Sequence, residues 1–260
     1  LSEPDKKQLR RRRWVGRSLV VLSGILLVLL TSPPGNGDTN LYTYDVLLDR
    51  AGESRTQFPG LIEFGHLAWR PIAALLYPLA SHMPEWLGSD PQEKLARTLA
   101  LVSVVSGLLT GVMMFEVVFT VSASVIVSVL AGVGLLGADA SLSYMETGNA
   151  YSLGLLFLTL AVWFAIGSAR GGRAQTRQAV LAGTSVALAS IVWIANVLVL
   201  PAVILTILVW GTDDWSRAGC LAPARLRRWA AAVLAFAILM TVAYGTAIVA
   251  AKIDSPGMLL

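Results

Sequence analysis

Charge-free stretches of membrane-spanning length recur along this chain of 260 residues. Each is at least about as long as the ~18 apolar residues that mark a candidate transmembrane helix. They cover residues 98–115, 117–138, 147–169, 178–212 and 229–251. Only 14% of the residues are charged, whereas a soluble domain carries about 25% charged residues. The sequence therefore predicts an all-α fold, a polytopic transmembrane helical bundle.

A basic block, DKKQLRRRR at residues 5–13, precedes the first apolar run. Lys and Arg are in excess on the cytosolic side of membrane proteins, so residues 1–14 are predicted to be a cytosolic N-terminus. Residues 1–34 lack a small-x-small cleavage site, which favours an uncleaved first helix over a signal peptide. The composition, rich in Arg, Ala, Val and Leu, is typical of bacteria. We therefore expect a multi-pass protein of the inner (plasma) membrane with membrane lipid, and not nucleic acid, as its partner.

About seven spans are expected within a transmembrane domain at residues 15–251. Loop charge decides the number, because the Arg-containing segments at 170–177 and 212–228 should lie on the same, cytosolic side. Two short helices that turn near Ile194–Asn196 would separate them. The expected spans are 15–32, 97–116, 120–137, 150–168, 179–193, 196–211 and 229–251. The tail at 252–260 would be external, and since it lacks a clear stop, the natural protein is expected to continue beyond it.

The longest polar segment, residues 33–96, is predicted to be an outer loop with helices of its own. Apolar residues recur at roughly helical spacing in FGHLAWRPIAALLYPLASHMPEWLG, and prolines divide this stretch into short pieces. Trp69, Tyr77 and Trp86 are of the residue types that gather at membrane interfaces. Short amphipathic helices lying in the interfacial plane are therefore expected, and a plain capping loop is the alternative.

Ionisable and aromatic side chains gather in the predicted outer loops, where a reaction could take place at the membrane surface. The first outer loop and the loop between the third and fourth spans together contribute Asp38, Tyr42, Tyr44, Asp45, His66, Arg70, Asp139, Glu146 and Asn149. If these spans are neighbours, the carboxylates converge, and one of them could take a proton from an acceptor hydroxyl as general base. The planar guanidinium of Arg70 matches phosphate oxygens. For any one of these residues alone, a solvated loop charge is the alternative.

The motifs and the cysteine count of the sequence exclude several kinds of site. The chain has no P-loop, no Rossmann glycine pattern, no HExxH and no GxSxG motif. The lone Cys220 excludes an internal disulfide and a cysteine-based metal cluster. A divalent cation could bind where carboxylates cluster, although no residue pattern fixes one. Glu116, near the inner end of the second span, is expected to snorkel toward the headgroups.

The order of these features resembles the C-type superfamily of membrane glycosyltransferases, which use polyprenyl-phosphate sugars and include protein O-mannosyltransferases and aminoarabinose transferases. Four stretches carry the resemblance: GDTNLYTYDVLLDRAG, GHLAWRPIAALLYPL, EKLARTLALVSVVSGLLTGVMMFEVV and SYMETGNAYSLGLLFLTLAVWFA. The first matches the outer loop that carries the catalytic aspartate of the family. This chain has Asp38-Thr39 where the family often has Asp-Glu, so Asp38 and Asp45 are both candidates for that role.

The resemblance implies transfer of a sugar from a polyprenyl-phosphate donor to an acceptor on the outer, extracytoplasmic face. Asp38 or Asp45 would be the general base, and Glu146 would support the base or the acceptor. Arg70 and His66 would contact the donor phosphate, although His66 lacks the two prolines that often follow the histidine of the family. The remaining expected substrate contacts are Tyr42, Tyr44, Asp139 and Asn149.

The alternative is a non-catalytic polytopic protein, either a transporter or an assembly subunit. A transporter places ionisable or helix-breaking residues near the middle of the membrane. The predicted spans carry no charge in their interiors, apart from Arg17 near the inner end of the first span. Charges gather at one face of the membrane instead, which favours interfacial chemistry over translocation.

Overall fold

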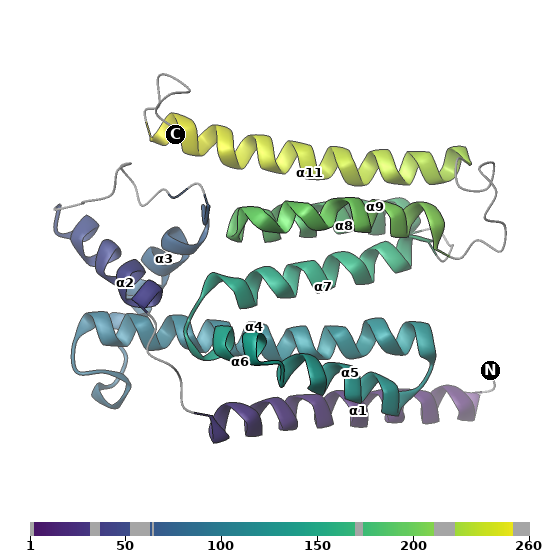
Figure 1. Ribbon diagram of the computed structural model, residues 1–260, viewed down its shortest axis with the longest axis horizontal. Coiled ribbons are helices and arrows are strands. Elements are labelled where there is room, and N and C mark those ends of the chain that lie inside the picture. Colours follow the sequence, from purple (N-terminus) through teal and green to yellow (C-terminus); the bar gives the residue numbers. More distant parts are fainter. Residues whose placement is uncertain are drawn as a thin grey trace.

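The structure is a computed structural model that describes residues 3–31, 37–52, 63, 65–169, 174–210 and 222–251. Within these ranges the chain is helical and contains no strand. The long helices lie side by side, and the shorter α2 and α3 gather at one end (Figure 1). The elements are α1 (Glu3–Leu30), α2 (Gly37–Arg50), α3 (Trp69–Ser81), η1 (Glu85–Leu87), α4 (Pro91–Ser122), α5 (Val125–Leu136), α6 (Asp139–Glu146), α7 (Ala150–Ala169), α8 (Gln175–Val192), η2 (Ile194–Val199), α9 (Leu200–Val209) and α11 (Pro223–Ala250).

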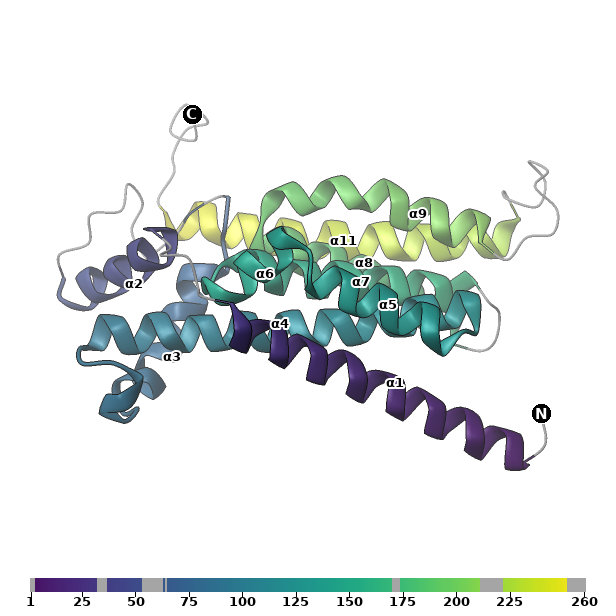
Figure 2. The ribbon, with the colours of Figure 1, turned by 60° about the horizontal axis from the view of Figure 1, so that its bottom comes forward.

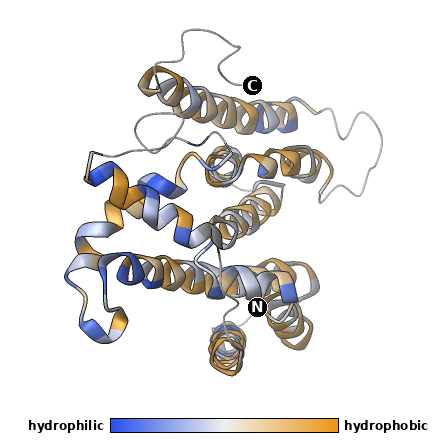
Figure 3. Cartoon of the chain, turned by 60° about the vertical axis from the view of Figure 1, so that its left-hand side comes forward, coloured by the Kyte–Doolittle hydropathy of each residue, from blue (hydrophilic) through white to orange (hydrophobic). Residues whose placement is uncertain are grey.

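Apolar and hydrophilic residues are distributed over the helices as expected of a helical membrane protein. Four of the described helices are long and apolar enough to cross a membrane: Lys7–Leu30, Pro91–Ser122, Ala150–Ala169 and Pro223–Ala250. The pair α5 and α6, bent by 60°, could make a fifth span. Hydrophilic residues gather around α2 and the start of α4, while the long helices are mostly hydrophobic (Figure 3).

The prediction of about seven spans is therefore wrong in number. The helix α8 begins with the polar sequence QTRQ, and it does not meet the apolarity of a span. The apolar stretch Ile194–Val209, formed by η2 and α9, is among the helices too short to cross. A chain reversal at Trp193, where the backbone is extended, does separate α8 from η2 at the predicted turn.

Two other connections between helices differ from the prediction. The turn expected at residues 115–122 lies later, because α4 remains helical up to Ser122 and ends where Ala123 adopts a left-handed conformation with φ of 53°. The second outer loop, predicted as a short connection, contains the helix α6 at Asp139–Glu146.

The described parts of the basic segments lie at one end of the bundle, as the loop charges predict. The starts of α1, α8 and α11 share that end (Figure 1). Arg228 donates to the carbonyl of Ser168 at the end of α7 at 2.5 Å, and Arg225 donates to the carbonyl of Leu208 in α9. The last carbonyls of a helix lack partners within it, so these two arginines complete the helix ends. Which side of the membrane this end faces stays a prediction.

Glu116 does not snorkel as predicted, because it lies buried between α4 and α1. The residue is 5% exposed, and its carboxylate accepts hydrogen bonds from Arg13 at 2.6 Å and from Arg17 at 2.9 Å. A buried carboxylate is tolerated when it is paired and hydrogen-bonded. Arg13 of the basic block and Arg17 thereby fix α1 to α4.

Small residues allow α8 and α11 to approach closely. A Cβ placed on Gly183 would lie 2.0 Å from the backbone oxygen of Ala232, which is itself fully buried. Close approach through small residues is the usual way in which helices pack in lipid. The position of α11 therefore depends on the absence of a side chain at Gly183.

Gly183→Ala is expected to destabilise the protein by about 1–3 kcal/mol, because the added methyl group overpacks a contact made with backbone atoms. The matched control is Gly245→Ala on α11, where a Cβ meets nothing within 4 Å. That control should be neutral or stabilising by about 0.5–1 kcal/mol, since alanine favours the helix. Thermal unfolding in detergent measures both, and equal effects would contradict the close packing of α8 on α11.

Candidate functional site

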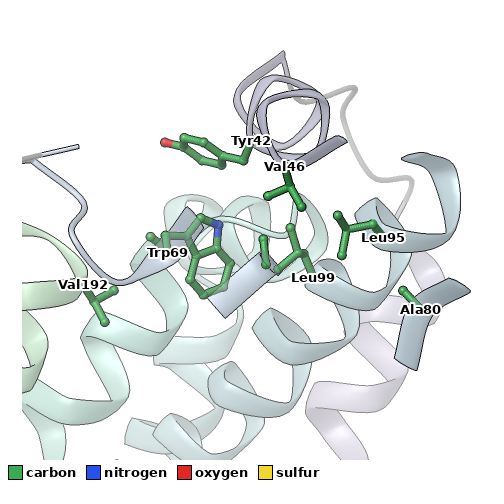
Figure 4. Close-up of a cluster of buried hydrophobic side chains, with 9 residues drawn as sticks. Tyr42, Val46, Trp69, Ala80, Leu95, Leu99 and Val192 are labelled. Carbon is green, nitrogen blue, oxygen red and sulfur yellow. The ribbon is translucent and has the colours of Figure 1, made fainter. Parts of the chain in front are cut away.

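The end of the bundle that carries α2 and α3 has its own packed core. Trp69, at the start of α3, is completely buried and lies between Leu99 and Val192, with Tyr42 and Val46 over it (Figure 4). Trp69 was predicted to lie at the membrane interface, so its burial corrects that expectation. This core fixes α2 and α3 on α4 and thereby sets the positions of the charged side chains around it.

Arg70 follows Trp69 and joins two carboxylates above this core. Its Nε donates to Asp45 Oδ2 at 2.8 Å, and its NH1 is paired with Glu63 Oε2. Arg70 is 8% exposed and Asp45 is 9% exposed. The guanidinium also lies over the ring of Tyr42, 5.0 Å from its centroid, a favourable cation–π geometry. Three of the predicted site residues are therefore in contact. We call Asp45, Glu63, His66 and Arg70, with Tyr42, the arginine cluster.

His66 completes the arginine cluster and faces an aromatic wall. Its Nδ1 lies 3.3 Å from Glu63 Oε1, while its Nε2 is buried without a hydrogen-bond partner in the described part of the chain. The ring lies 6.1 Å from Tyr151, which in turn is 4.5 Å from both Tyr144 and Trp193. The buried Nε2 is an unused donor or acceptor at the edge of these rings.

The loop that carries His66 is fixed by backbone hydrogen bonds to the break between α8 and η2. The amide of Ala68 donates to the carbonyl of Ile191 at 3.1 Å, and the amide of Ile194 donates to the carbonyl of Gly65 at 3.0 Å. The reversal at Trp193 frees these backbone groups from helical pairing. The irregular backbone in α8–η2 thus positions the histidine loop.

The neighbours of Glu63 in the arginine cluster change its acidity. The hydrogen bond with His66 holds the pKa of Glu63 below its ordinary value of 4.5; the nearby Arg70 acts in the same direction, and partial burial opposes both. A carboxylate whose pKa is lower in the folded than in the unfolded state stabilises the fold at pH values above its unfolded-state pKa. That stabilisation is lost as pH falls through the folded value.

Glu63→Gln is expected to lower the melting temperature at neutral pH. Below pH 4.5 the melting temperature of the variant should depend less on pH than that of the wild type. The wild type and the variant should converge in stability as the pH falls below the pKa of the folded state. Thermal unfolding in detergent over a pH series measures this. A constant difference between the two proteins at every pH would contradict the assigned role of Glu63.

A second group of polar residues lies where the chain leaves α1 and enters α2. The hydroxyl of Thr31 donates to Glu146, and the hydroxyl of Thr39 donates to the backbone carbonyl of Thr147. Thr31 and Thr39 therefore both contact the connection between α6 and α7. Beside this contact is a cavity of about 520 Å³, lined by Thr39, Asn40, Asp90, Gln92, Glu93, Ala96, Arg97, Ala100, Glu146 and Thr147.

The convergence of Asp38 with Glu146 stays a prediction. Glu146 accepts from Thr31 just after α1, and its neighbour Thr147 accepts from Thr39 on α2. Asp38 is a helical residue next to Thr39, and its side chain lies outside the described part of the chain. Asp139 is exposed at the opposite end of α6, so it does not join Glu146. Asn149 is 5% exposed and accepts from the amide of Ala150 at 3.2 Å, which suits a structural role at the start of α7.

Several residues at this end were not predicted as site residues. Glu63 is the main one, and the spacing Glu63–His66–Arg70 was the available signal, because all three meet around the first turn of α3. The aromatic wall of Tyr144, Tyr151 and Trp193 comes from segments remote in sequence, and no local pattern signals it. Tyr44, in contrast, is 41% exposed on α2, away from the cluster formed by Tyr42 and Arg70.

Among the described residues, no group of three or more His, Cys, Asp or Glu side chains could hold a metal ion. The carboxylates of the arginine cluster are instead paired with Arg70. A divalent cation at the outer loops therefore stays an expectation from the sequence alone.

Comparison of the chain with protein-family models, with characterised proteins and with solved structures finds no match. The functional assignment consequently rests on the residue pattern and on the geometry of this end of the bundle.

Proposed function

We propose that this chain is a membrane glycosyltransferase that moves a sugar from a polyprenyl-phosphate donor to an acceptor at the outer face of the inner membrane. The observation that carries the proposal is that the helix α2, at the polar end of an apolar bundle, contributes both to the arginine cluster, through Asp45, and to the cavity beside Glu146, through Thr39. Buried ionisable groups near a membrane surface are costly and are more often kept for a function than solvated charges are.

The two groups divide the reaction between them. A carboxylate at the cavity takes the proton from the acceptor hydroxyl, and the acceptor oxygen attacks the anomeric carbon. The bond from that carbon to the phosphate oxygen breaks, so the polyprenyl phosphate leaves with the electron pair and the sugar is inverted. Arg70 and His66 Nε2 hold the leaving phosphate, because a guanidinium and an imidazole N–H donate to its oxygens. The phosphate takes the place of Glu63, the more exposed of the two carboxylates paired with Arg70.

Asp38 is the better candidate for the base. The carboxylate of Asp45 is buried and accepts a hydrogen bond from Arg70, so an acceptor hydroxyl would have to displace Arg70 to reach it. Asp38 follows Gly37 at the start of α2, next to the contact of Thr39 with Thr147. In this assignment Asp45 positions Arg70, and Glu146 contacts the acceptor.

The two histidines of the chain provide a matched test of the donor contact. His66→Gln is expected to raise the KM for a polyprenyl-phosphate sugar, or to lower kcat/KM, by about tenfold or more, because a hydrogen bond to a charged group is lost. His82 is exposed, and its Nδ1 lies 2.6 Å from the carbonyl oxygen of Pro78. His82→Gln should therefore leave the kinetics unchanged.

Turnover is measured in proteoliposomes with labelled donor and a membrane extract as the source of acceptor. Equal kinetics of the His66 and His82 variants would contradict the donor contact. If the wild type transfers sugar from none of the lipid-linked donors, the chain is a non-catalytic membrane protein, such as a transporter or assembly subunit.

A further inference from the structure

A groove of about 720 Å³ opens at the basic end of the bundle, at the opposite end from α2 and α3. One wall is the first part of α1, with Arg11, Arg12 and Val15, and the other is the turn from α4 to α5, with Phe119 and Ile126. Figure 2 shows that α1 lies at the edge of the bundle, at an angle to α4. The groove therefore combines two cations with an apolar floor.

The charges at this groove are not neutralised by the described part of the chain. Glu116, the buried acid nearest along α4, is already paired with Arg13 and Arg17. Arg11 and Arg12 are exposed, and no described side chain forms a hydrogen bond or ion pair with them. Two adjacent cations are left to face the groove, so its complement is an anion.

The apolar side of the groove continues into the membrane. Gln8, Arg11, Arg12 and Val15 line the groove on α1, and Leu19 and Leu22 extend the same helical stripe at spacings of three and four residues. Leu19 is 47% exposed and Leu22 is 62% exposed. An anionic head placed between the arginines would therefore have its hydrocarbon chain beside these leucines.

We propose that this groove binds one anionic phospholipid of the leaflet that meets the basic end of the bundle. The phosphate pairs with Arg11 and Arg12, and an acyl chain lies along Val15, Leu19 and Ile126. A phospholipid complements both the cations and the apolar floor of the groove, whereas a soluble anion would pair with the cations and leave the apolar floor uncovered. The inference does not depend on the proposed transferase activity.

Lipid retention measured by native mass spectrometry of the full chain tests this site, with phosphatidylglycerol compared with phosphatidylcholine. The wild type should retain phosphatidylglycerol preferentially. Arg11→Gln and Arg12→Gln should each weaken that retention about fivefold, because one arginine near an anionic surface contributes about that much affinity. Arg10→Gln is the matched control, since Arg10 is an exposed neighbour on α1 that does not line the groove.

Ile126→Gln, which changes the apolar wall and no charge, should also reduce retention. Equal losses in all three arginine variants would overturn the proposal in favour of general attraction by a polybasic segment. Equal retention of the two lipids, or displacement of phosphatidylglycerol by soluble glycerol phosphate, would overturn it as well.

Discussion

Arg70→Met is expected to destabilise the protein by about 3–5 kcal/mol, because it leaves the buried carboxylate of Asp45 without a counter-charge. Asp45 is 9% exposed and has Arg70 as its ion-pair partner in the described part of the chain. Methionine preserves much of the length of the arginine side chain, so the change isolates the loss of charge and hydrogen bonds. The loss should appear as a lower melting temperature in detergent at neutral pH.

Two further variants test the interpretation. Arg97→Met removes a cation that is 51% exposed and paired with Glu93, and such a surface pair contributes only about 0–1 kcal/mol. Adding Asp45→Asn to Arg70→Met should recover part of the lost stability, because the uncompensated charge disappears. If Arg70→Met and Arg97→Met cost the same, the arginine cluster does not hold α2 on α3.

Asp38→Asn is expected to lower the rate of sugar transfer by about 10²–10⁴-fold, the usual contribution of a general base. The amide keeps the size of the side chain and cannot accept the proton. Asp139→Asn is the matched control, since Asp139, expected from the sequence to contact the substrate, is exposed at the opposite end of α6 from Glu146. It should leave the rate within about twofold of the wild type, because surface charges remote from a reaction contribute little.

Asp45→Asn separates the two candidate roles of that aspartate. If Asp45 only positions Arg70, the variant should lose stability and donor affinity while retaining part of kcat. If Asp45 is the base, its kcat should fall as far as predicted here for Asp38→Asn, and Asp38→Asn should be nearly active. Rates and melting temperatures measured on the same preparations distinguish these outcomes.

The helical nature of the protein and the positions of its long helices follow from charge-free stretches in the sequence. The stretch 98–115 lies within α4, and the stretch 229–251 is helical up to the end of α11 at Ala250, because an apolar run of this length can satisfy its backbone in lipid only as a helix. In short polar segments the local sequence pattern did not predict where a helix would form. DASLSYME becomes the helix α6, and its position depends on contacts with α4 and α7.

The site was predictable in its residue types and only partly in its geometry. Tyr42, Asp45, His66 and Arg70 were expected to gather on the outer side, and they are in contact at the end of the bundle that carries α2 and α3. The role of Asp45 as a partner of Arg70 depends on how α3 packs on α2, which no single segment encodes. Trp69 shows the same limit, because an aromatic residue next to a membrane can belong to an interface or to a buried core.

The most direct test of the account is transfer of labelled sugar from a polyprenyl-phosphate donor by proteoliposomes that carry the wild type, Asp38→Asn or Asp45→Asn. We expect the wild type to transfer sugar with inversion and Asp38→Asn to be folded and inserted but inactive. Failure of the wild type to turn over any lipid-linked donor, with a folded and inserted protein, would contradict the proposed transferase function.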